Sequence, residues 1–112
     1  MKFHITPDTL VACYELLCTV VPFKSWNLPP SDAVKFRVTR HKDVAGCCDG
    51  VSISISEHYH GHLSTLLATM SHEMIHLYGF LIKERGYIAH GAAFKRRAEQ
   101  VCTVLGFDPK VF

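Results

Sequence analysis

Two histidines and a glutamate have the spacing H-E-x-x-H in the stretch SHEMIHLYGF, residues 71–80. Successive residues of a helix turn by about 100°, so His72 and His76 differ by about 40° and their rings would project side by side. Two such imidazoles can bind one zinc ion, while a glutamate beside them can take a proton from a water molecule that the metal activates. The motif therefore predicts a hydrolytic metal site with His72 and His76 as ligands and Glu73 as the catalytic base.

The apolar residues of the same segment predict an amphipathic helix, and the position of the motif on this helix argues against a chance match. The histidine pair lies about 160° from the centre of the apolar stripe, whereas a histidine that only fills the core should lie within it. Composition alone would produce the motif in roughly two or three of a hundred such chains, so its place on the helix adds weight to the metal site. The stripe consists of Leu63, Leu67, Met70, Met74 and Leu77.

A catalytic zinc ion needs a third protein ligand and an open position for water. The extended pattern H-E-x-x-H-x-x-G-x-x-H would put this ligand at Ile82, which cannot bind a metal. Glu84 follows too soon unless the helix breaks, and Glu99 lies about 120° from the apolar face of its own predicted helix. His90 is the better candidate, because it stands at the start of a helix that Phe94 would anchor in the core.

Three helices are predicted to position these residues. The first runs from Pro7 to about residue 20, where Thr6 is a typical cap and Pro22 stops the helix. The second, residues 64–79, carries the H-E-x-x-H motif. The third is the last element of the chain and ends at Gly106. Its inner face is predicted to consist of Phe94, Ala98, Val101, Cys102 and Leu105.

A small sheet is predicted between the first two helices. Residues 34–40 and 51–56 alternate apolar and polar side chains, as half-buried strands do. Asp49-Gly50 is a typical hairpin turn, so VAGCC, residues 44–48, would form a short strand before it. The short connections favour an antiparallel arrangement. The predicted fold class is therefore α+β, with an N-terminal helix, a short antiparallel β-meander, the H-E-x-x-H helix and a C-terminal helix.

Length and composition predict a single domain, residues 1–112, that can bury a modest core. The apolar share of 48% and the charged share of 20% are typical of a globular chain. No apolar run approaches the ~20 residues of a membrane span, and the N-terminus lacks the pattern of an export signal, so a cytoplasmic protein is expected. Five cysteines without a C-x-x-C pair predict neither a disulfide framework nor a zinc ribbon. A net charge of +2 is too small to indicate nucleic-acid binding by itself.

Two short segments, HEMIH at 72–76 and HGAAF at 90–94, follow one another in the chain. In these segments the chain resembles the SprT-like (Spartan-related) zinc metallopeptidases, whose core has an H-E-x-x-H helix followed by a separate H-G-x-x-F. The strand VSISIS before the helix, and the turn region AGCCDG before that strand, extend the resemblance to residues 6–107.

The resemblance implies a small zincin-like metallopeptidase core in which His72, His76 and His90 hold a zinc ion and Glu73 is catalytic. It also implies a protein or peptide substrate, with DNA-associated proteins as one class. Many members of the family carry a C-terminal zinc ribbon or other DNA-binding segments, which this sequence lacks up to Phe112. At most a weak association with DNA is therefore expected, and none with membranes.

Two alternatives are open for the strand at residues 51–56. A peptide substrate could add alongside it and present a carbonyl group to the metal through main-chain hydrogen bonds. Otherwise the strand is fully paired inside the sheet. No partner for the developing oxyanion stands out, because Tyr78 and Tyr87 are near the motif but are typical packing residues.

Two further groups of polar residues have both a functional and a structural interpretation. His58, His60 and His62 alternate, so in an extended segment they would point the same way and could bind a second metal ion. A polar loop is favoured there, because nothing fixes these rings. The basic triplet Lys95–Arg97 could contact phosphate, but a solvated helix face is favoured.

Two other functions compete with the peptidase. HLYGF is faintly similar to the pattern of a three-histidine metal endoribonuclease, which requires glycine and histidine where this chain has Glu73 and Ile82. A non-catalytic binding module could use zinc only to hold its last helix, but such a module has no need of Glu73. A zinc-dependent endopeptidase is therefore the preferred function.

Overall fold

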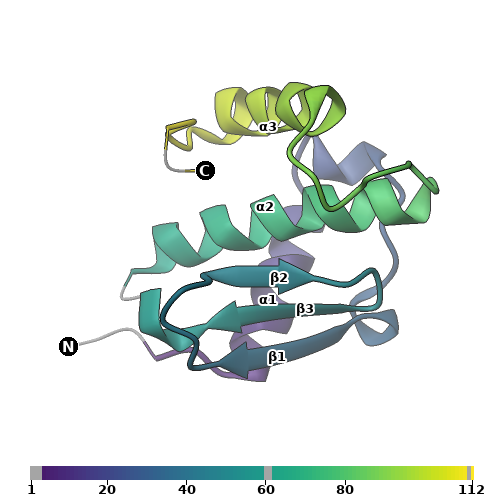
Figure 1. Cartoon of the computed structure of the whole chain (residues 1–112). Coiled ribbons are helices and arrows are strands. Elements are labelled where there is room, and N and C mark those ends of the chain that lie inside the picture. Colours follow the sequence, from purple (N-terminus) through teal and green to yellow (C-terminus); the bar gives the residue numbers. More distant parts are fainter. Residues whose placement is uncertain (1–3, 60–61, 111) are drawn as a thin grey trace.

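The helices and strands follow one another in the order α1, β1, β2, β3, α2, α3 (Figure 1). The computed structural model describes residues 4–59, 62–110 and 112. Each predicted helix and strand is present, which confirms the α+β class. The α-helices are α1 (Pro7–Cys18), α2 (Leu63–Leu81) and α3 (Ala92–Leu105); the strands are β1 (Lys35–Thr39), β2 (Gly46–Cys48) and β3 (Ser52–Ser56); short 3₁₀ turns lie at Phe23–Ser25, Ser31–Ala33 and Glu57–Tyr59.

The strands form a mixed sheet in the order β1-β3-β2. Strands β1 and β3 are parallel, with Phe36 beside Ile53, whereas β2 and β3 are antiparallel. The hairpin at Asp49-Gly50 is therefore confirmed. The antiparallel meander is wrong, because β3 lies between the two strands that precede it in the chain. This order arises because residues 40–45 carry the chain past the position that β3 later fills.

Strand β3 takes the central position because it is buried on both faces. Ile53 and Ile55 point into the core, and Ser52 and Ser56 on the other face are buried as well. The hydroxyl group of Ser56 donates to the carbonyl of His41 at 2.6 Å, so this buried polar group is satisfied. Both edges of β3 are paired within the sheet. A peptide therefore cannot add alongside this strand, and the outer strand next to α2 is β2 (Figure 1).

Helix α1 packs against β1 and α2. Its start is a capping box, in which the hydroxyl of Thr6 accepts from the N–H of Thr9 and the side chain of Thr9 accepts from the N–H of Thr6. Tyr14 is buried against the ring of Phe36, and its hydroxyl donates to the carbonyl of Pro29 at 2.7 Å. The helix thereby covers the part of the sheet that α2 leaves open.

The middle of helix α2 is largely buried, because the helix lies between the sheet and α3 (Figure 1). Leu66, Met70 and Met74 are fully buried in the main core. On its other sides the connection to α3 covers His76 and strand β2 covers Glu73, which are only 6% and 5% exposed. At Glu73 and His76 the polar face of this helix is thus covered by neighbouring segments rather than by solvent.

Helix α3 packs on α2 with the predicted inner face. Phe94, Val101 and Cys102 are buried. The helix ends at Gly106, whose φ of +82° is in the left-handed region that glycine adopts without strain. In the residues that follow, the rings of Phe107 and Phe112 stack with centroids 6.0 Å apart. None of the helices in the described residues combines the length and hydropathy that crossing a bilayer requires.

Candidate metal centre

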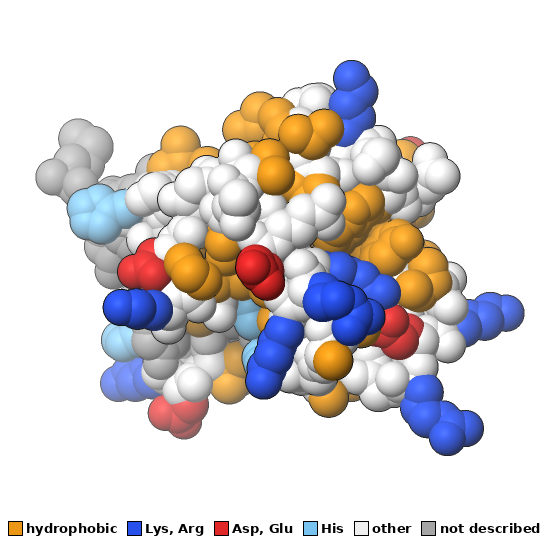
Figure 2. Space-filling view, turned by 90° about the horizontal axis from the view of Figure 1, so that it is seen from above, with side chains coloured by type: hydrophobic (Ala, Val, Ile, Leu, Met, Phe, Trp, Pro, Cys, Tyr) orange, Lys and Arg blue, Asp and Glu red, His pale blue; other side chains and the backbone are white. Residues whose placement is uncertain are grey.

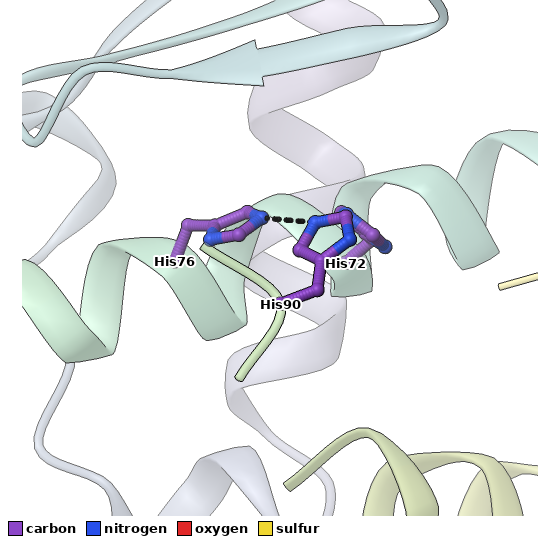
Figure 3. A group of neighbouring side chains, drawn as sticks. All are labelled: His72, His76 and His90. Carbon is purple, nitrogen blue, oxygen red and sulfur yellow. Dashed lines mark hydrogen bonds between the residues drawn. The ribbon is translucent and has the colours of Figure 1, made fainter. Parts of the chain in front are cut away.

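Three histidines from two segments of the chain meet beside helix α2 (Figure 3). His72 and His76 come from α2, and His90 comes from the connection just before α3. One ligand atom of each ring lies within 4.8 Å of the other two, and the ring centroids are 4.9–5.1 Å apart. The Nε2 atoms of His76 and His90 are 3.1 Å apart. The structure therefore brings together the three residues that the sequence predicts as ligands.

This donor set fits a catalytic zinc ion. Zinc binds imidazole nitrogen at ~2.0–2.1 Å in a tetrahedral arrangement, which puts the ligand nitrogens roughly 3.3–3.4 Å apart. The separation of 3.1 Å between His76 and His90 is close to that value. In the described part of the chain no carboxylate joins the three rings in this group. Three protein ligands leave a fourth position for water or substrate, as catalytic rather than structural zinc sites do.

The hydrogen bond made by Nδ1 shows which nitrogen of the neutral His76 ring carries the proton. Nδ1 lies 2.8 Å from the carbonyl oxygen of Tyr87, and since a carbonyl only accepts, Nδ1 donates. In the neutral ring Nε2 then has a free lone pair, and this atom is directed at His90. A backbone carbonyl commonly orients metal-binding histidines in this way, so the contact prepares His76 for a metal ion.

Burial keeps the two histidines of α2 neutral. Burial, and after it the neighbouring rings of His76 and His90, lower the pKa of His72 to about 4. Burial also lowers the pKa of His76, although the hydrogen bond to Tyr87 acts in the opposite direction. Neutral imidazole is the form that binds a metal. At neutral pH both rings therefore present a lone pair without first having to lose a proton.

The contacts of Phe94 explain why a phenylalanine follows the third histidine in the H-G-x-x-F motif. Its ring stacks on His90 with centroids 4.4 Å apart and on His76 with centroids 4.7 Å apart. It lies on α3, is 8% exposed and belongs to the main core. His90 itself is exposed. The phenylalanine therefore gives an exposed ring a fixed apolar surface to lie on.

Glu73 follows His72 directly but lies outside the group of ligand atoms. It is 5% exposed, and burial raises the pKa of its carboxyl group to about 7. A carboxyl group with such a pKa can both accept and release a proton near neutral pH, which is what general acid–base catalysis requires. Both its place and its pKa suit the role of catalytic base.

Gly46 of strand β2 makes room for this carboxyl group. A Cβ atom at position 46 would lie 2.9 Å from Oε2 of Glu73 and 3.0 Å from the methyl group of Thr69. The sequence predicts Gly46 only as part of the short strand VAGCC and of the turn region AGCCDG, with no contact to Glu73. A signal was present, because an isolated glycine inside a strand often marks a close approach of another group to the backbone.

A cleft of about 650 Å³ opens beside His72 and Glu73. Its walls are the segment at 43–46, the N-terminal half of α2 and the residues that follow α3. The ring of Phe112 lies 5.5 Å from that of His72 and stacks on the ring of Phe107. The cleft thus combines apolar walls with a few polar groups, as ligand-binding sites commonly do.

Strand β2 borders this cleft at Gly46, its first residue. The carbonyl of Ala45 accepts a hydrogen bond from the N–H of Ser56 at 2.8 Å, so Ala45 faces β3. Because alternate residues of an antiparallel strand face opposite edges, the main-chain groups of Gly46 and Cys48 face away from β3. Within the described residues no strand pairs with β2 on that side. Such an edge can accept a further strand.

The carboxylates considered as third ligand lie elsewhere. Glu84 pairs with Arg97 through two hydrogen bonds of 2.8 and 2.9 Å. Glu99 is exposed on α3. Ile82, at the position of the third histidine in the extended motif, is 47% exposed at the end of α2. None of them belongs to the group that could hold a metal ion.

The two tyrosines near the motif pack against aromatic neighbours. Tyr78 lies 4.8 Å from Trp26, and Tyr87 lies 5.3 Å from Phe80, measured between ring centroids. The side chain of Tyr87 therefore supports the connection to α3, and its carbonyl group orients His76. These contacts agree with the packing interpretation of both residues.

Of the alternating histidines, His60 lies outside the described residues. His58 is part of a 3₁₀ turn and His62 is the residue before α2, and both are exposed. The segment is therefore not extended at His58, which removes the reason for expecting the rings to point the same way. Among the residues that the structure describes, neither His58 nor His62 belongs to a group that could hold a metal ion.

Comparison with protein families agrees with the resemblance drawn from the two motifs. The SprT-like family model matches residues 15–111, which contain both HEMIH and HGAAF. Neither the curated proteins nor the solved structures gave a match. The family match covers most of the chain, including all three histidines and Glu73.

Proposed function

Because the chain belongs to the SprT-like family, we propose that it is a zinc-dependent endopeptidase. In this proposal His72, His76 and His90 hold the zinc ion, and Glu73 is the general base. The observation that carries it is the convergence of three imidazoles beside a buried carboxyl group in an open cleft. A site that serves only the fold is usually closed by four protein ligands.

Zinc held by the three rings would supply a Lewis acid that makes a water molecule more acidic and polarises the peptide carbonyl. Glu73 takes the proton from the attacking water and then passes it to the leaving amine. Its pKa of about 7 suits both steps, because one group must accept a proton and release it near neutral pH. The close approach of Gly46 limits the positions that this carboxyl group can take.

The substrate is proposed to bind as an extended chain along the outer edge of β2. The main-chain groups of Gly46 and Cys48 would pair with it, which gives affinity without demanding a particular sequence. Gly46 also lines the cleft together with His72 and Glu73. A strand paired there would therefore pass directly by the metal centre and the catalytic base.

The walls of the cleft favour apolar side chains next to the bond that is cleaved. Val44, Ala68 and Phe107 all line it. The acidic residues Asp43 and Asp108 line it as well, so basic residues elsewhere in the substrate should be accepted better than acidic ones. The proposed substrate class is thus an unfolded or extended protein segment with an apolar residue at the cleavage point.

Any association with DNA is proposed to be weak. On the face seen in Figure 2, basic side chains are spread among acidic and apolar ones rather than gathered in one continuous patch. Lys95 and Arg96 are exposed on α3, but Arg97 is paired with Glu84. Phosphate binding depends on several unpaired cations acting together. Weak binding of DNA by the chain itself does not exclude DNA-associated proteins, which are one class of substrate within the proposal.

The variant Glu73→Gln separates a peptidase from a non-catalytic module that zinc only stabilises. We expect it to keep one equivalent of zinc and to lose peptide cleavage by roughly 100-fold or more, since a general base contributes about 10²–10⁴-fold. Zinc content by atomic spectroscopy and cleavage of an unfolded protein would be measured together. Glu99→Gln, at an exposed position, is the control. Wild-type protein that holds zinc but cleaves no peptide, with or without DNA, would contradict the proposal, and cleavage of RNA would favour the endoribonuclease.

A further inference from the structure

His90 is the ligand that most needs support from its surroundings. It is exposed and belongs to the connection at residues 82–91, whereas His72 and His76 lie on a packed helix. Every residue that becomes ordered only when the metal binds costs conformational entropy. A centre that binds its metal tightly therefore needs this connection to be held in place beforehand.

One ion pair ties the start of this connection to helix α3. Nη1 and Nη2 of Arg97 donate to Oε1 and Oε2 of Glu84 at 2.9 and 2.8 Å. A guanidinium and a carboxylate that meet in this way fix each other's orientation as well as their distance. The two side chains are only 20% and 27% exposed. The hydrogen bonds from Arg97 lower the pKa of Glu84, so the carboxylate stays ionised at neutral pH.

Helix α2 holds the same guanidinium group from a second side. Its central carbon lies 5.0 Å from the centre of the Tyr78 ring, within the range of a cation–π interaction. Tyr78 is in turn packed against Trp26. Arg97 of α3 therefore contacts helix α2 and the connection at the same time. A lysine could supply the charge but not the planar double contact.

The path from Glu84 to the metal centre is short and closely packed. The N–H of Glu84 donates to the carbonyl of Gly79 at 2.9 Å. A Cβ atom on Gly79 would lie 3.0 Å from Cβ of Tyr87, so the connection folds directly onto α2. The carbonyl of Tyr87 is the group that accepts from Nδ1 of His76. Movement of this segment would therefore disturb both His76 and His90.

We infer that the Glu84–Arg97 pair is a positioning device for the metal centre. It holds the connection in the shape that brings the carbonyl of Tyr87 and the ring of His90 to His76 before a metal ion arrives. Neither member of the pair belongs to the ligand group, so both act through other residues. The inference rests on the proposed function insofar as the three histidines bind zinc. A pair that stabilised only the fold would leave the zinc affinity of the folded protein unchanged.

The test compares zinc affinity with the stability of the metal-free protein. Glu84→Gln and Arg97→Gln should each weaken zinc binding about tenfold or more, within the roughly 10–100-fold range typical of residues that orient metal ligands. Affinity would be measured by competition with a chromophoric chelator, and unfolding by urea in the presence of EDTA. The exchanged double variant Glu84→Arg/Arg97→Glu should recover part of the loss, because it restores the attraction between the two positions.

Two exposed residues of α3 provide matched controls. Lys95→Gln and Glu99→Gln remove one charge of each sign from the same helix and should leave zinc affinity within about twofold of wild type. If the glutamine variants do not fold without metal, Arg97→Lys and Glu84→Asp take their place. Both keep the charge, but lysine lacks the planar pair of donors and aspartate is one methylene too short to reach Arg97 at the same distance, so both should still weaken zinc binding.

The outcomes distinguish this inference from the proposed function. Wild-type protein that binds one zinc ion, with folded pair variants that bind it equally well, would overturn the positioning role and leave the peptidase proposal standing. Wild-type protein that binds no zinc would overturn the metal centre itself. Weaker binding in the folded pair variants, with partial recovery in the exchanged double variant, would support the inference.

Discussion

Gly46 and Glu73 approach each other so closely that a side chain at position 46 would have to displace the carboxyl group: a Cβ atom there would lie 2.9 Å from its Oε2. Strand β2 and helix α2 thus set the position of the proposed catalytic base together. This contact links the edge that would bind substrate to the group that would move the proton, and it can be tested apart from metal binding.

Gly46→Ala should therefore lower the rate of cleavage without removing the metal. The added methyl group would push the carboxyl group of Glu73 and the side chain of Thr69 aside, and a general base out of position loses much of its roughly 10²–10⁴-fold contribution. We expect kcat to fall by about tenfold or more at unchanged zinc content. Cys47→Ala, at the exposed neighbouring position of the same strand, should change neither quantity. Unchanged kcat in a folded Gly46→Ala variant would show that this contact is unimportant.

His90→Ala should remove the metal ion while the metal-free protein stays folded. Two histidines on one helix would remain, and a site of two ligands binds zinc far more weakly than a site of three. The loss of affinity should exceed the roughly 10–100-fold that is typical when a residue that only orients a metal ligand is replaced. Zinc content after dialysis is the measurement, with His4→Ala, at an exposed position near the N-terminus, as the control. If zinc stays at one equivalent in His90→Ala, another residue must be the third ligand.

The raised pKa of Glu73 predicts a stability that depends on pH in the metal-free protein. The carboxyl group ionises near 4.5 when the chain is unfolded but at about 7 when it is folded and buried. The folded state therefore loses stability, relative to the unfolded state, as the pH rises from 4.5 to 7, and the loss is complete above 7. Its size should be on the order of 3–4 kcal/mol, since the pKa rises by about 2.5 units and each unit corresponds to about 1.4 kcal/mol.

Glu73→Gln removes this ionisation and should be more stable than wild type at pH 8 but not at pH 4. Urea unfolding with EDTA present, at several pH values, gives the comparison. The lowered pKa values of His72 and His76 act in the other direction, because the unfolded state takes up protons first as the pH falls. The effect of these histidines is the same in wild type and in Glu73→Gln, so it cancels when the two free energies of unfolding are subtracted. A stability difference that does not change with pH would contradict the assignment.

Phe107→Ala should change which peptides are cleaved rather than how the metal is held. Phe107 forms part of the apolar wall of the cleft and stacks on Phe112, so its removal opens the space next to the cleavage point. We expect kcat/KM for a peptide with leucine at that point to fall roughly tenfold, with little change for alanine, since apolar contacts of this size contribute about 1–3 kcal/mol. An equal loss for both peptides would argue that this wall has no part in selecting the substrate.

The sequence by itself determined the local features of the protein. The spacing of His72 and His76 on one helix, the helix start at Thr6 and the stop at Gly106 were all predicted correctly. These features depend on residues within one or two turns of each other, and the helical period makes them visible in the sequence. Pairing the H-E-x-x-H motif with His90 was also available from the sequence, since the two segments together resemble one family.

The tertiary structure alone decided how distant segments meet. The meander prediction failed because strand order depends on which strand is buried on both faces, and β3 is that strand. The contact of Gly46 with Glu73 and the pairing of Glu84 with Arg97 join elements that no local pattern connects. Burial of the polar face of α2, which raises the pKa of Glu73 and lowers that of His72, likewise depends on the layers packed around it. Periodicity reports which residues share a face, but what covers that face is decided only when the whole chain packs.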